Sequence, residues 1–368
     1  MWIWIIVVVL ILVVLVYQNT GMSENKGNIK IGLIAPLTGD VATIGQGTKS
    51  AAELAISEIN SAGGVNGRML TLISEDGKCD GKESVSAVTK LVNIDKVDAI
   101  VGGTCSSESV AAAPIAEKAK VVMISPVSSS PALTTAGDYI FRDYPSDSFQ
   151  GSKAADFAVN TLKAKNIAVL SCLSDWCQGI QQVFKDKTTS LGANIVADEK
   201  YDDKATKDLK TQLTKIKATN PDLVYFLGYT DGTVIGLKQA KEVGLNAKIL
   251  GGDAWGDPKV VAGAGYAAEG TMYLIPASVP NVTFDSAFEK ATGSNEVTIG
   301  ARESYDAVKI LAQVMKDVGT NGTKIKDALY KVQGYQGVSG NISFDKNGDI
   351  SSTNYDIKIV KDGKPVNY

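Results

Sequence analysis

With 368 residues, the chain is long enough to form two or more domains. Its composition, 44% hydrophobic and 21% charged, predicts a sizeable buried core. The formal net charge of −3 excludes the basic footprint of a nucleic-acid-binding protein, so no nucleic-acid partner is expected. The sequence contains no histidine, which excludes histidine-based triads, histidine general bases and histidine metal ligands.

The chain opens with a continuously apolar stretch from Trp2 to Tyr17. This stretch is just shorter than the roughly 17–25 residues of a membrane-spanning helix and longer than a typical signal-peptide core. No cysteine directly follows it, so a lipoprotein anchor is not expected, and nothing amphipathic pairs it with a domain as a buried helix. We expect residues 1–21 to form a hydrophobic helix that serves as export signal and membrane anchor, with residues 22–28 as a linker.

After the linker, apolar strands alternate with amphipathic helices in two successive series. In the first series the predicted strands are 29–35, 70–75, 99–102 and 121–125, with helices near 51–62 and 85–92 and a loop over 36–47. In the second series the predicted strands are 167–171, 195–201, 223–228 and 248–252, with helices over 150–162, 181–190, 209–218 and 234–243. Such alternation is typical of parallel βαβ units, so the fold class is α/β with two doubly wound parallel-sheet lobes.

The last hundred residues continue this pattern and then change character. A strand is expected over 270–275, followed by helices over 284–292 and 300–318. Residues 342–350 and 355–361 are typical of a hairpin, with Asn347-Gly348 at the turn.

The stretch from Ala99 to Pro131 is the strongest candidate for a binding site. An apolar strand ends in Gly102-Gly103 and a hydroxyl-rich turn, a helix follows, and the unit repeats, so that Ser106-Ser107 and Ser128-Ser129 meet at one sheet edge. Backbone N–H groups at the following helix starts attract anions there. Open α/β sheets bind ligands beyond this edge, so the stretch predicts half of a small-molecule site.

Two other runs imitate known motifs without matching them. The run Gly45-Gln-Gly-Thr-Lys-Ser50 has serine where a dinucleotide-binding loop needs its third glycine, and it is not a P-loop. The run Asp345-Lys-Asn-Gly-Asp349 lacks the spacing of a calcium loop and is better explained by the hairpin turn. With no nucleophile–base pair visible either, we expect no enzyme activity, no metal and no cofactor.

Four cysteines fit an oxidising compartment. Cys79 and Cys105 lie 26 positions apart, each following a predicted strand, and a disulfide between them would hold the turn that carries Ser106. Cys172 and Cys177 follow a third strand and are expected to form a local disulfide. Metal ligation is the alternative for the first pair, although further ligands are lacking, and a redox role is the alternative for the second.

Several polar and aromatic residues follow strands of the second series. Asp253 ends a predicted strand, where its carboxylate would accept from an ammonium group or cap the next helical turn. Trp176, Tyr229 and Trp255 occupy similar positions and would line an apolar pocket or pack a loop. Three N-x-Ser/Thr sequons, at Asn281, Asn321 and Asn341, are compatible with glycosylation.

From about Asn28 to its end, the chain resembles the branched-chain amino-acid-binding proteins of ABC importers, which have the type I periplasmic-binding fold. The resemblance rests on six runs: Ile31-Gly-Leu-Ile-Ala-Pro-Leu-Thr-Gly39, Ala55-Ile-Ser-Glu-Ile-Asn-Ser-Ala-Gly-Gly-Val-Asn-Gly67, Cys79-Asp-Gly-Lys, Cys105-Ser-Ser, Met123-Ile-Ser-Pro126 and Gly244-Leu. It implies a solute-binding protein that holds the zwitterionic head of an amino acid between two lobes. Cys79 and Cys105 match the disulfide of leucine/isoleucine/valine binders.

The resemblance also implies roles for individual residues. Ser106 and Ser129 would bind the ligand α-carboxylate through hydroxyl and backbone N–H groups. The Val127 carbonyl and the Ser129 hydroxyl would bind the α-ammonium, with Asp253 as its acidic partner. Trp176 would cover the ligand from the second lobe.

Some positions depart from the family pattern. Thr230 rather than Tyr229 is expected to face the ligand, and Ile44 stands where an aromatic residue is common. Serine at position 129 replaces a usual threonine, and Asp253 replaces a usual glutamate. Because Ile44 and Trp176 add apolar surface and no Arg or Lys is placed for an acidic side chain, an aliphatic amino acid is the expected ligand.

The resemblance places residues 29–144 with 276–340 in the first lobe and residues 145–275 with 341–368 in the second. Three hinge crossovers, near Tyr144–Asp147, Ile275–Pro276 and Gly340, would let the lobes close over the ligand. The expected partners are the ligand and the membrane subunits of an ABC permease, with a monomeric, extracytoplasmic protein held by its N-terminal segment. The alternatives are a binding protein for amides, urea, aromatic acids or another small solute, and a membrane-tethered sensory ectodomain.

Overall fold

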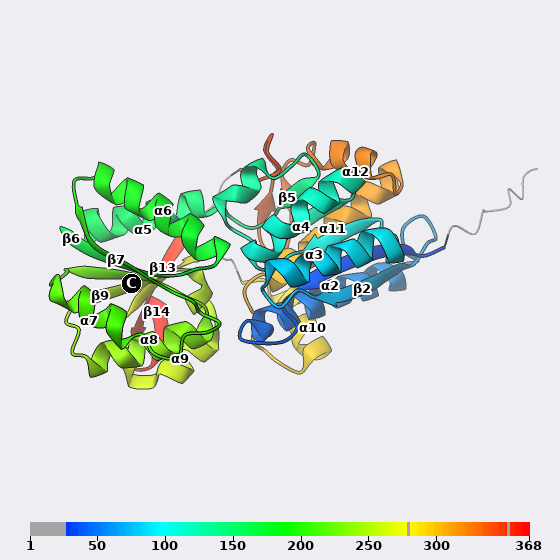
Figure 1. The fold of residues 1–368 in the computed structure, drawn as a ribbon. Helices are drawn as coiled ribbons and strands as arrows, with labels where there is room; N and C mark the ends of the chain where they lie inside the picture. Colours follow the sequence, from blue (N-terminus) through cyan, green and yellow to red (C-terminus); the bar gives the residue numbers. More distant parts are fainter. Residues whose placement is uncertain (1–26, 278–279, 352–353) are drawn as a thin grey trace, which may run out of the picture.

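The computed structural model describes residues 27–277, 280–351 and 354–368. The expected hydrophobic helix over residues 1–21 and most of the linker lie outside these ranges. Figure 1 shows two lobes side by side, each built on one sheet flanked by helices. Within the described ranges, every helix is too short or too polar to cross a membrane.

The first lobe is built on a parallel five-stranded sheet in the order β2-β1-β3-β4-β5. Its strands are β1 (Ile29–Ala35), β2 (Leu70–Asp76), β3 (Ala99–Gly102), β4 (Val122–Ser125) and β5 (Ile140–Arg142). Its helices are α2 (Ala42–Ser61), α3 (Gly81–Lys90), α4 (Ser106–Ala119), α10 (Val282–Thr292), α11 (Ala301–Val318) and α12 (Gly322–Leu329). The strand order reverses at β1, so the crevice between the ends of β1 and β3 lies at the switch point where open α/β sheets bind ligands.

Strands of the first lobe read as near-continuous apolar runs because helices cover both faces of the sheet. One face packs against α2, α11 and α12, and the other packs against α3 and α4. Shorter elements complete the lobe: π-helical Leu91–Asp95, 3-10 helical Pro131–Thr135, and the two-stranded pair β11 (Tyr335–Gln336) and β12 (Asn341–Ile342).

The second lobe is built on a seven-stranded sheet in the order β14-β13-β10-β9-β8-β6-β7. Its strands are β6 (Asn166–Cys172), β7 (Asn194–Tyr201), β8 (Leu223–Leu227), β9 (Lys248–Gly251), β10 (Met272–Pro276), β13 (Tyr355–Lys361) and β14 (Lys364–Asn367). Its α-helices are α5 (Asp147–Asp156), α6 (Asp175–Ser190), α7 (Lys210–Ala218), α8 (Thr230–Glu242) and α9 (Pro258–Ala264). Shorter helical segments are Phe157–Thr161, Asp253–Gly256 and Gly265–Ala268.

The sheet of the second lobe differs from the expected all-parallel arrangement at one edge. β13 pairs antiparallel with β10, and β14 pairs antiparallel with β13. The hairpin that includes residues 355–361 therefore turns at Asp362-Gly363, and the Asn347-Gly348 turn belongs to a separate element.

That separate element corrects the expected lobe boundary at residue 340. Ile342 and Phe344 are buried in the core of the first lobe, where the Phe344 ring lies 5.3 Å from the ring of Phe141. Phe344 also forms an antiparallel bridge with Ile350 across the Asn347-Gly348 turn. Apolar burial therefore holds residues 341–350 on the first lobe, whereas Tyr355–Lys361 form β13 of the second lobe.

The start of α2 is a second difference. A loop was expected over residues 36–47, whereas α2 begins at Ala42 and includes Gly45 and Gly47. A Cβ atom at Gly45 would collide with the Pro36 carbonyl, and one at Gly47 would collide with the Thr298 side chain. These glycines therefore allow close packing of a helix and do not mark a loop.

Candidate functional site

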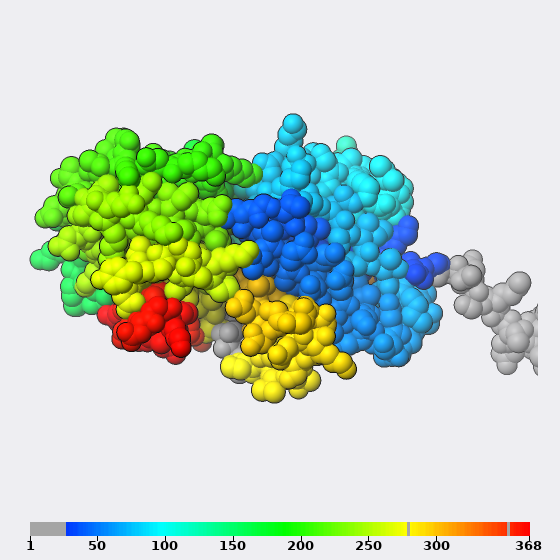
Figure 2. Space-filling model, turned by 90° about the horizontal axis from the view of Figure 1, so that it is seen from below, coloured from blue at the N-terminus to red at the C-terminus, as the bar shows by residue number. Residues whose placement is uncertain are grey.

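A small cavity lies between the two lobes at the carboxyl ends of their strands. The first lobe contributes Val41, Ile44, Thr104, Cys105, Ser106, Val127, Ser129 and Ile299, and the second contributes Trp176, Tyr229, Asp253 and Ala254. Six of the seven expected ligand residues thus line one cavity: Ile44, Ser106, Val127, Ser129, Trp176 and Asp253. The boundary between the lobes is closely packed on the face seen in Figure 2, where atoms of the two lobes meet.

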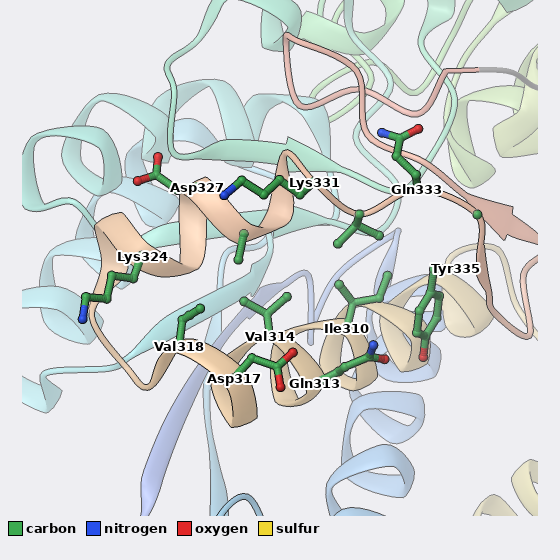
Figure 3. A pocket seen from close by; sticks show the side chains of 13 residues that line it. Ile310, Gln313, Val314, Asp317, Val318, Lys324, Asp327, Lys331, Gln333 and Tyr335 are labelled. Carbon is green, nitrogen blue, oxygen red and sulfur yellow. The ribbon is translucent and has the colours of Figure 1, made fainter.

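A larger groove lies on the first lobe alone, between α11 and α12 (Figure 3). Its lining includes Ile310, Val314, Lys324, Lys331 and Tyr335, and none of the expected ligand residues. A ligand bound there would touch only one lobe and would therefore not couple binding to lobe closure. The cavity between the lobes is the better candidate.

The hydroxyl-rich edge of the first lobe is organised by its own hydrogen bonds. The Ser106 Oγ, at the first position of α4, accepts from the Ser130 N–H at 3.1 Å and so joins the two turns that follow β3 and β4. The Ser128 and Ser125 hydroxyls both donate to the Gly103 carbonyl, at 2.9 and 2.7 Å. Ser128 thus supports the turn from beneath, and Ser106 and Ser129 remain at the cavity wall.

The disulfide Cys79–Cys105 is present, as expected, next to this edge. The buried Glu108 carboxylate accepts from the N–H groups of both cysteines, at 3.0 Å from Cys79 and 2.9 Å from Cys105. Burial raises the pKa of Glu108 to about 7, against the effect of these hydrogen bonds. One carboxylate and one disulfide therefore hold the Ser106 turn in place.

Two aromatic side chains form the wall of the second lobe. Trp176 lies in the first turn of α6, inside the loop closed by the disulfide Cys172–Cys177, and its ring lies 5.1 Å from the ring of Tyr229. Thr230, which was expected to face the ligand, is not among the residues that line the cavity. The Thr230 hydroxyl donates to Asp257 at 2.8 Å, away from the cavity, whereas Tyr229 lines the cavity.

Asp253 supplies the carboxylate of the second lobe. It is 4% exposed, its Oδ2 accepts from the Tyr144 hydroxyl at 2.7 Å, and its N–H donates to the Gln150 side chain at 3.1 Å. Burial raises the pKa of Asp253, partly offset by the hydrogen bonds from Tyr144 and Gln150. Two residues from the first crossing between the lobes therefore hold Asp253 at the cavity.

Asp147 is a site residue that sequence reasoning missed. It opens α5 and is fully buried, and its N–H donates to the Ser129 carbonyl at 2.7 Å. Burial raises its pKa well above the ordinary value, and the charge of Asp253 adds to this effect. The Ser129 hydroxyl and Trp176 indole lie close enough to oppose that shift, yet neither carboxylate oxygen has a well-formed hydrogen bond among the described residues. In the sequence, Asp147 is indistinguishable from an ordinary first-turn acid.

The polar groups of the cavity are thus divided by sign. Hydroxyl and N–H donors lie at the start of α4 on the first lobe, and the Asp253 carboxylate lies at the opposite wall, with the buried Asp147 close to it. Buried charges require charged or hydrogen-bonding partners. The arrangement therefore suits a ligand with an anionic group at one end and a cationic group at the other. Among the described residues, no cluster of carboxylates and thiols could hold a metal ion.

Comparison with known proteins agrees with this geometry. The family model described as periplasmic binding protein matches residues 28–364. The chain belongs to the periplasmic binding protein family. Such binding proteins take up solutes for transport and are not enzymes, and they act outside the cytoplasm.

Individual relatives of this periplasmic binding protein cover nearly its whole length. The leucine-, isoleucine-, valine-, threonine- and alanine-binding protein of Pseudomonas aeruginosa is 33% identical over 90% of this chain and 89% of its own. Among solved structures, a leucine binding protein from Thermotoga maritima has a TM-score of 0.84 at 28% identity, covering 92% of this chain and 97% of its own. A branched-chain amino acid transporter substrate binding protein from Streptococcus pneumoniae, in complex with isoleucine, has a TM-score of 0.83 at 30% identity and covers 93% of this chain and 100% of its own.

Proposed function

We propose that this protein is the extracytoplasmic solute-binding component of an ABC importer and that it binds an aliphatic L-amino acid. The observation that carries the proposal is the separation of charge in one interlobe cavity, with donors on the first lobe and the Asp253 carboxylate opposite, close to the buried Asp147. Ligand binding then favours the closed arrangement of the lobes by its higher affinity for that arrangement. The closed protein delivers the amino acid to a membrane permease.

In this proposal the ligand head group is held from both lobes. The α-carboxylate accepts from the Ser106 and Ser129 hydroxyls and from N–H groups at the start of α4, where the helix dipole favours an anion. The α-ammonium donates to the Asp253 carboxylate, the Val127 carbonyl and the Ser129 hydroxyl. Asp147 lies close to Ser129, Trp176 and Asp253 and adds a second negative charge at the ammonium end.

The rest of the cavity suits an aliphatic side chain. Val41, Ile44 and Ile299 come from the first lobe, and Trp176 and Tyr229 come from the second. Among the described residues that line the cavity there is no lysine or arginine to pair with an acidic side chain. The names of the relatives, which include leucine, isoleucine and valine and in one case also threonine and alanine, support the same class of ligand.

The alternatives differ in what they leave unpaired. A neutral amide or urea would leave the buried carboxylates of Asp147 and Asp253 without a cation, which is costly.

A monomeric protein tethered by residues 1–21 remains part of our proposal. A sensory ectodomain would use the same cavity, and a permease gene beside this gene would favour transport whereas a kinase gene would favour sensing.

The function is tested by identifying the bound ligand and then comparing its affinity with the affinities of close analogues. Mass spectrometry of small molecules released from the purified, denatured protein is expected to detect a branched-chain amino acid. Calorimetry is expected to show tight binding of L-leucine, L-isoleucine or L-valine. Leucinamide, which lacks the carboxylate, and 4-methylpentanoate, which lacks the ammonium, serve as matched controls and are expected to bind at least about a hundredfold more weakly. Equal affinity for 4-methylpentanoate would overturn the assigned role of the carboxylates.

A further inference from the structure

A second set of interlobe contacts lies at the mouth of the cleft, outside the ligand cavity. A groove there is lined by both lobes, and nine of its lining residues are charged. From the first lobe these are Asp40, Lys78, Asp80, Lys82 and Glu83, and from the second they are Asp203, Lys204, Lys207 and Asp231. The ligand assignment above uses none of them.

Three polar contacts join the lobes at or near this groove. Lys204 of the second lobe pairs with Asp80 of the first, at 2.7 Å between Nζ and Oδ2. The Asp231 N–H donates to the Asp40 carboxylate at 2.9 Å. The Asp175 N–H donates to the Ser107 hydroxyl at 3.3 Å. These contacts exist only when the lobes are together, so the structure represents a closed arrangement.

The contact at Asp40 has a favourable and an unfavourable part. The side chain of Tyr229, the N-cap residue of α8, makes no capping hydrogen bond, and Asp40 supplies a carboxylate to the first turn of α8 from the opposite lobe. In the closed form the Asp40 carboxylate also lies near the carboxylates of Asp203 and Asp231, and the like charges repel. The nearby Lys204 is already paired with Asp80, and Lys78 lies 3.8 Å from Glu83.

We propose that Asp40 is a proton-sensitive brake on lobe closure, opposed by a latch formed by Lys204 and Asp80. The proposal rests on the proposed function in one respect, namely that the lobes open and close around a ligand. When the lobes separate, Asp40 returns to water and leaves Asp203 and Asp231 behind. Closure therefore buries a charge among like charges unless Asp40 takes up a proton.

The charges around Asp40 in the closed form support the conclusion that protonation of Asp40 favours closure. Burial, together with the charges of Asp231 and Asp203, raises the pKa of Asp40 to about 6, although the Asp231 N–H lowers it. Burial also raises the pKa of Asp203. Tyr201 and Tyr229, which lie nearby, have raised pKa values and stay neutral in this range. A group whose pKa is higher in the closed form favours closure most at pH values below its ordinary pKa, and this effect is lost as the pH rises through about 6.

The size of the effect follows from the same shift. One pKa unit corresponds to a factor of ten in the closing equilibrium. Between pH 7.5 and pH 5, protonation of Asp40 should favour closure about tenfold. L-Leucine remains a zwitterion throughout this range, so its own charge does not change.

The test compares the wild type with Asp40→Asn, which keeps an acceptor for the Asp231 N–H but carries no charge. Because closure raises the pKa of Asp40 from its ordinary value of 3.8 to about 6, calorimetry with L-leucine at pH 7.5 is expected to show about a hundredfold tighter binding by D40N than by the wild type. At pH 5 the advantage of D40N should fall to about tenfold, because Asp40 of the wild type is then mostly protonated in the closed form but still mostly ionised in the open form. Other buried carboxylates also titrate in this range, and the ratio of the two affinities isolates the contribution of Asp40.

The latch is tested by Lys204→Glu with Lys207→Glu as its matched control. Both variants make the same change of charge on the same loop, but Lys207 has no ion pair among the described residues. K204E is expected to weaken leucine binding at least about threefold more than K207E does. Equal weakening would show that only the overall charge matters and would overturn the latch.

Small-angle X-ray scattering of the ligand-free proteins gives a measurement that does not depend on the ligand. At pH 7.5, D40N is expected to have a smaller radius of gyration than the wild type, and at pH 5 the difference between the two radii should be smaller. If the radii behave in this way but leucine does not bind, the ligand assignment is wrong and the brake stands. Identical radii, with equal leucine affinities or with no leucine binding, overturn the brake.

Discussion

The two walls of the interlobe cavity are built in different ways. On the first lobe, Ser106 and Ser129 occupy turns that follow neighbouring strands, and local hydrogen bonds and one disulfide hold these turns. On the second wall, Asp253 is held by Tyr144 and Gln150, which are more than a hundred positions away in the chain. The first wall is therefore preorganised by local structure, whereas the second is assembled by packing around the first crossing.

This difference bears on what each wall can contribute. A turn held within one lobe can bind the ligand carboxylate before the lobes close. The carboxylates of Asp147 and Asp253 are buried close to each other, and their like charges repel when both are ionised. A bound cation therefore offsets a repulsion that destabilises the closed, ligand-free protein. We therefore expect changes in the second wall to affect affinity most, and some of them to improve stability.

The largest effect is expected from Asp253→Ala. Removing one partner of a buried charge pair costs about 3–5 kcal/mol, so amino-acid affinity should fall at least about a hundredfold. Asp257→Asn is the matched control, because Asp257 is also buried and lies in the same loop but contacts Thr230 and not the cavity. Calorimetry measures both affinities, and circular dichroism checks the fold. Unchanged affinity in D253A would remove Asp253 from the ammonium site.

Asp147→Asn is expected to act on binding and stability in opposite directions. Losing the second negative charge should weaken leucine binding about tenfold, while removal of a buried, unpaired charge should raise the Tm of the ligand-free protein by about 2–4 °C. Because the folded-state pKa of Asp147 is raised, its contribution to the free energy of unfolding is largest below the ordinary aspartate pKa and falls as the pH rises. The stability advantage of D147N should therefore be greater at pH 8 than at pH 5, as thermal unfolding would show. A lower Tm at pH 8 would contradict this account.

How far the site could be predicted follows the same division between the walls. The serines of the first wall follow glycine-ended apolar strands, and parallel strands necessarily bring such turns to one edge, so their positions follow from local patterns. Asp147 gives no such signal, because its importance depends on burial beside Asp253, which only the assembled hinge creates. The sequence predicts Thr230 at the cavity, whereas the structure places Tyr229 there. The cause is similar, since a one-residue shift in the start of α8 decides which side chain faces the cavity.

The fold shows the same limit. The alternation of strands and helices predicts both lobes, because periodicity reports which face of an element is buried. It does not predict that residues 341–350 stay on the first lobe, because that depends on the contact between Phe344 and Phe141. Nor does it predict that α2 begins before Gly45, since those glycines are required by close neighbours far away in the sequence.

Ser106→Ala tests the first wall and should have a smaller effect than Asp253→Ala. The Ser106 hydroxyl contributes one hydrogen bond to the ligand carboxylate, while the N–H groups of α4 remain, so affinity should fall about tenfold. Ser128→Ala is the matched control, because the Ser128 hydroxyl donates beneath the turn and does not line the cavity. S128A should lower the Tm more than the affinity, and S106A should do the reverse. Calorimetry and thermal unfolding of both variants provide the comparison.

The smallest effects are expected from the aromatic side of the second wall, where neighbouring residues can be compared directly. Tyr229→Leu removes the ring that contacts Trp176 but keeps apolar volume, so leucine affinity should fall about three- to tenfold, in line with the contribution of an aromatic pair. Thr230→Val removes only the hydrogen bond to Asp257, so it should lower the Tm and leave the affinity within about twofold of the wild type. If Thr230→Val instead weakened binding more than Tyr229→Leu, the start of α8 would have to be rotated by one residue in the ligand-bound protein, and Thr230 would face the ligand after all.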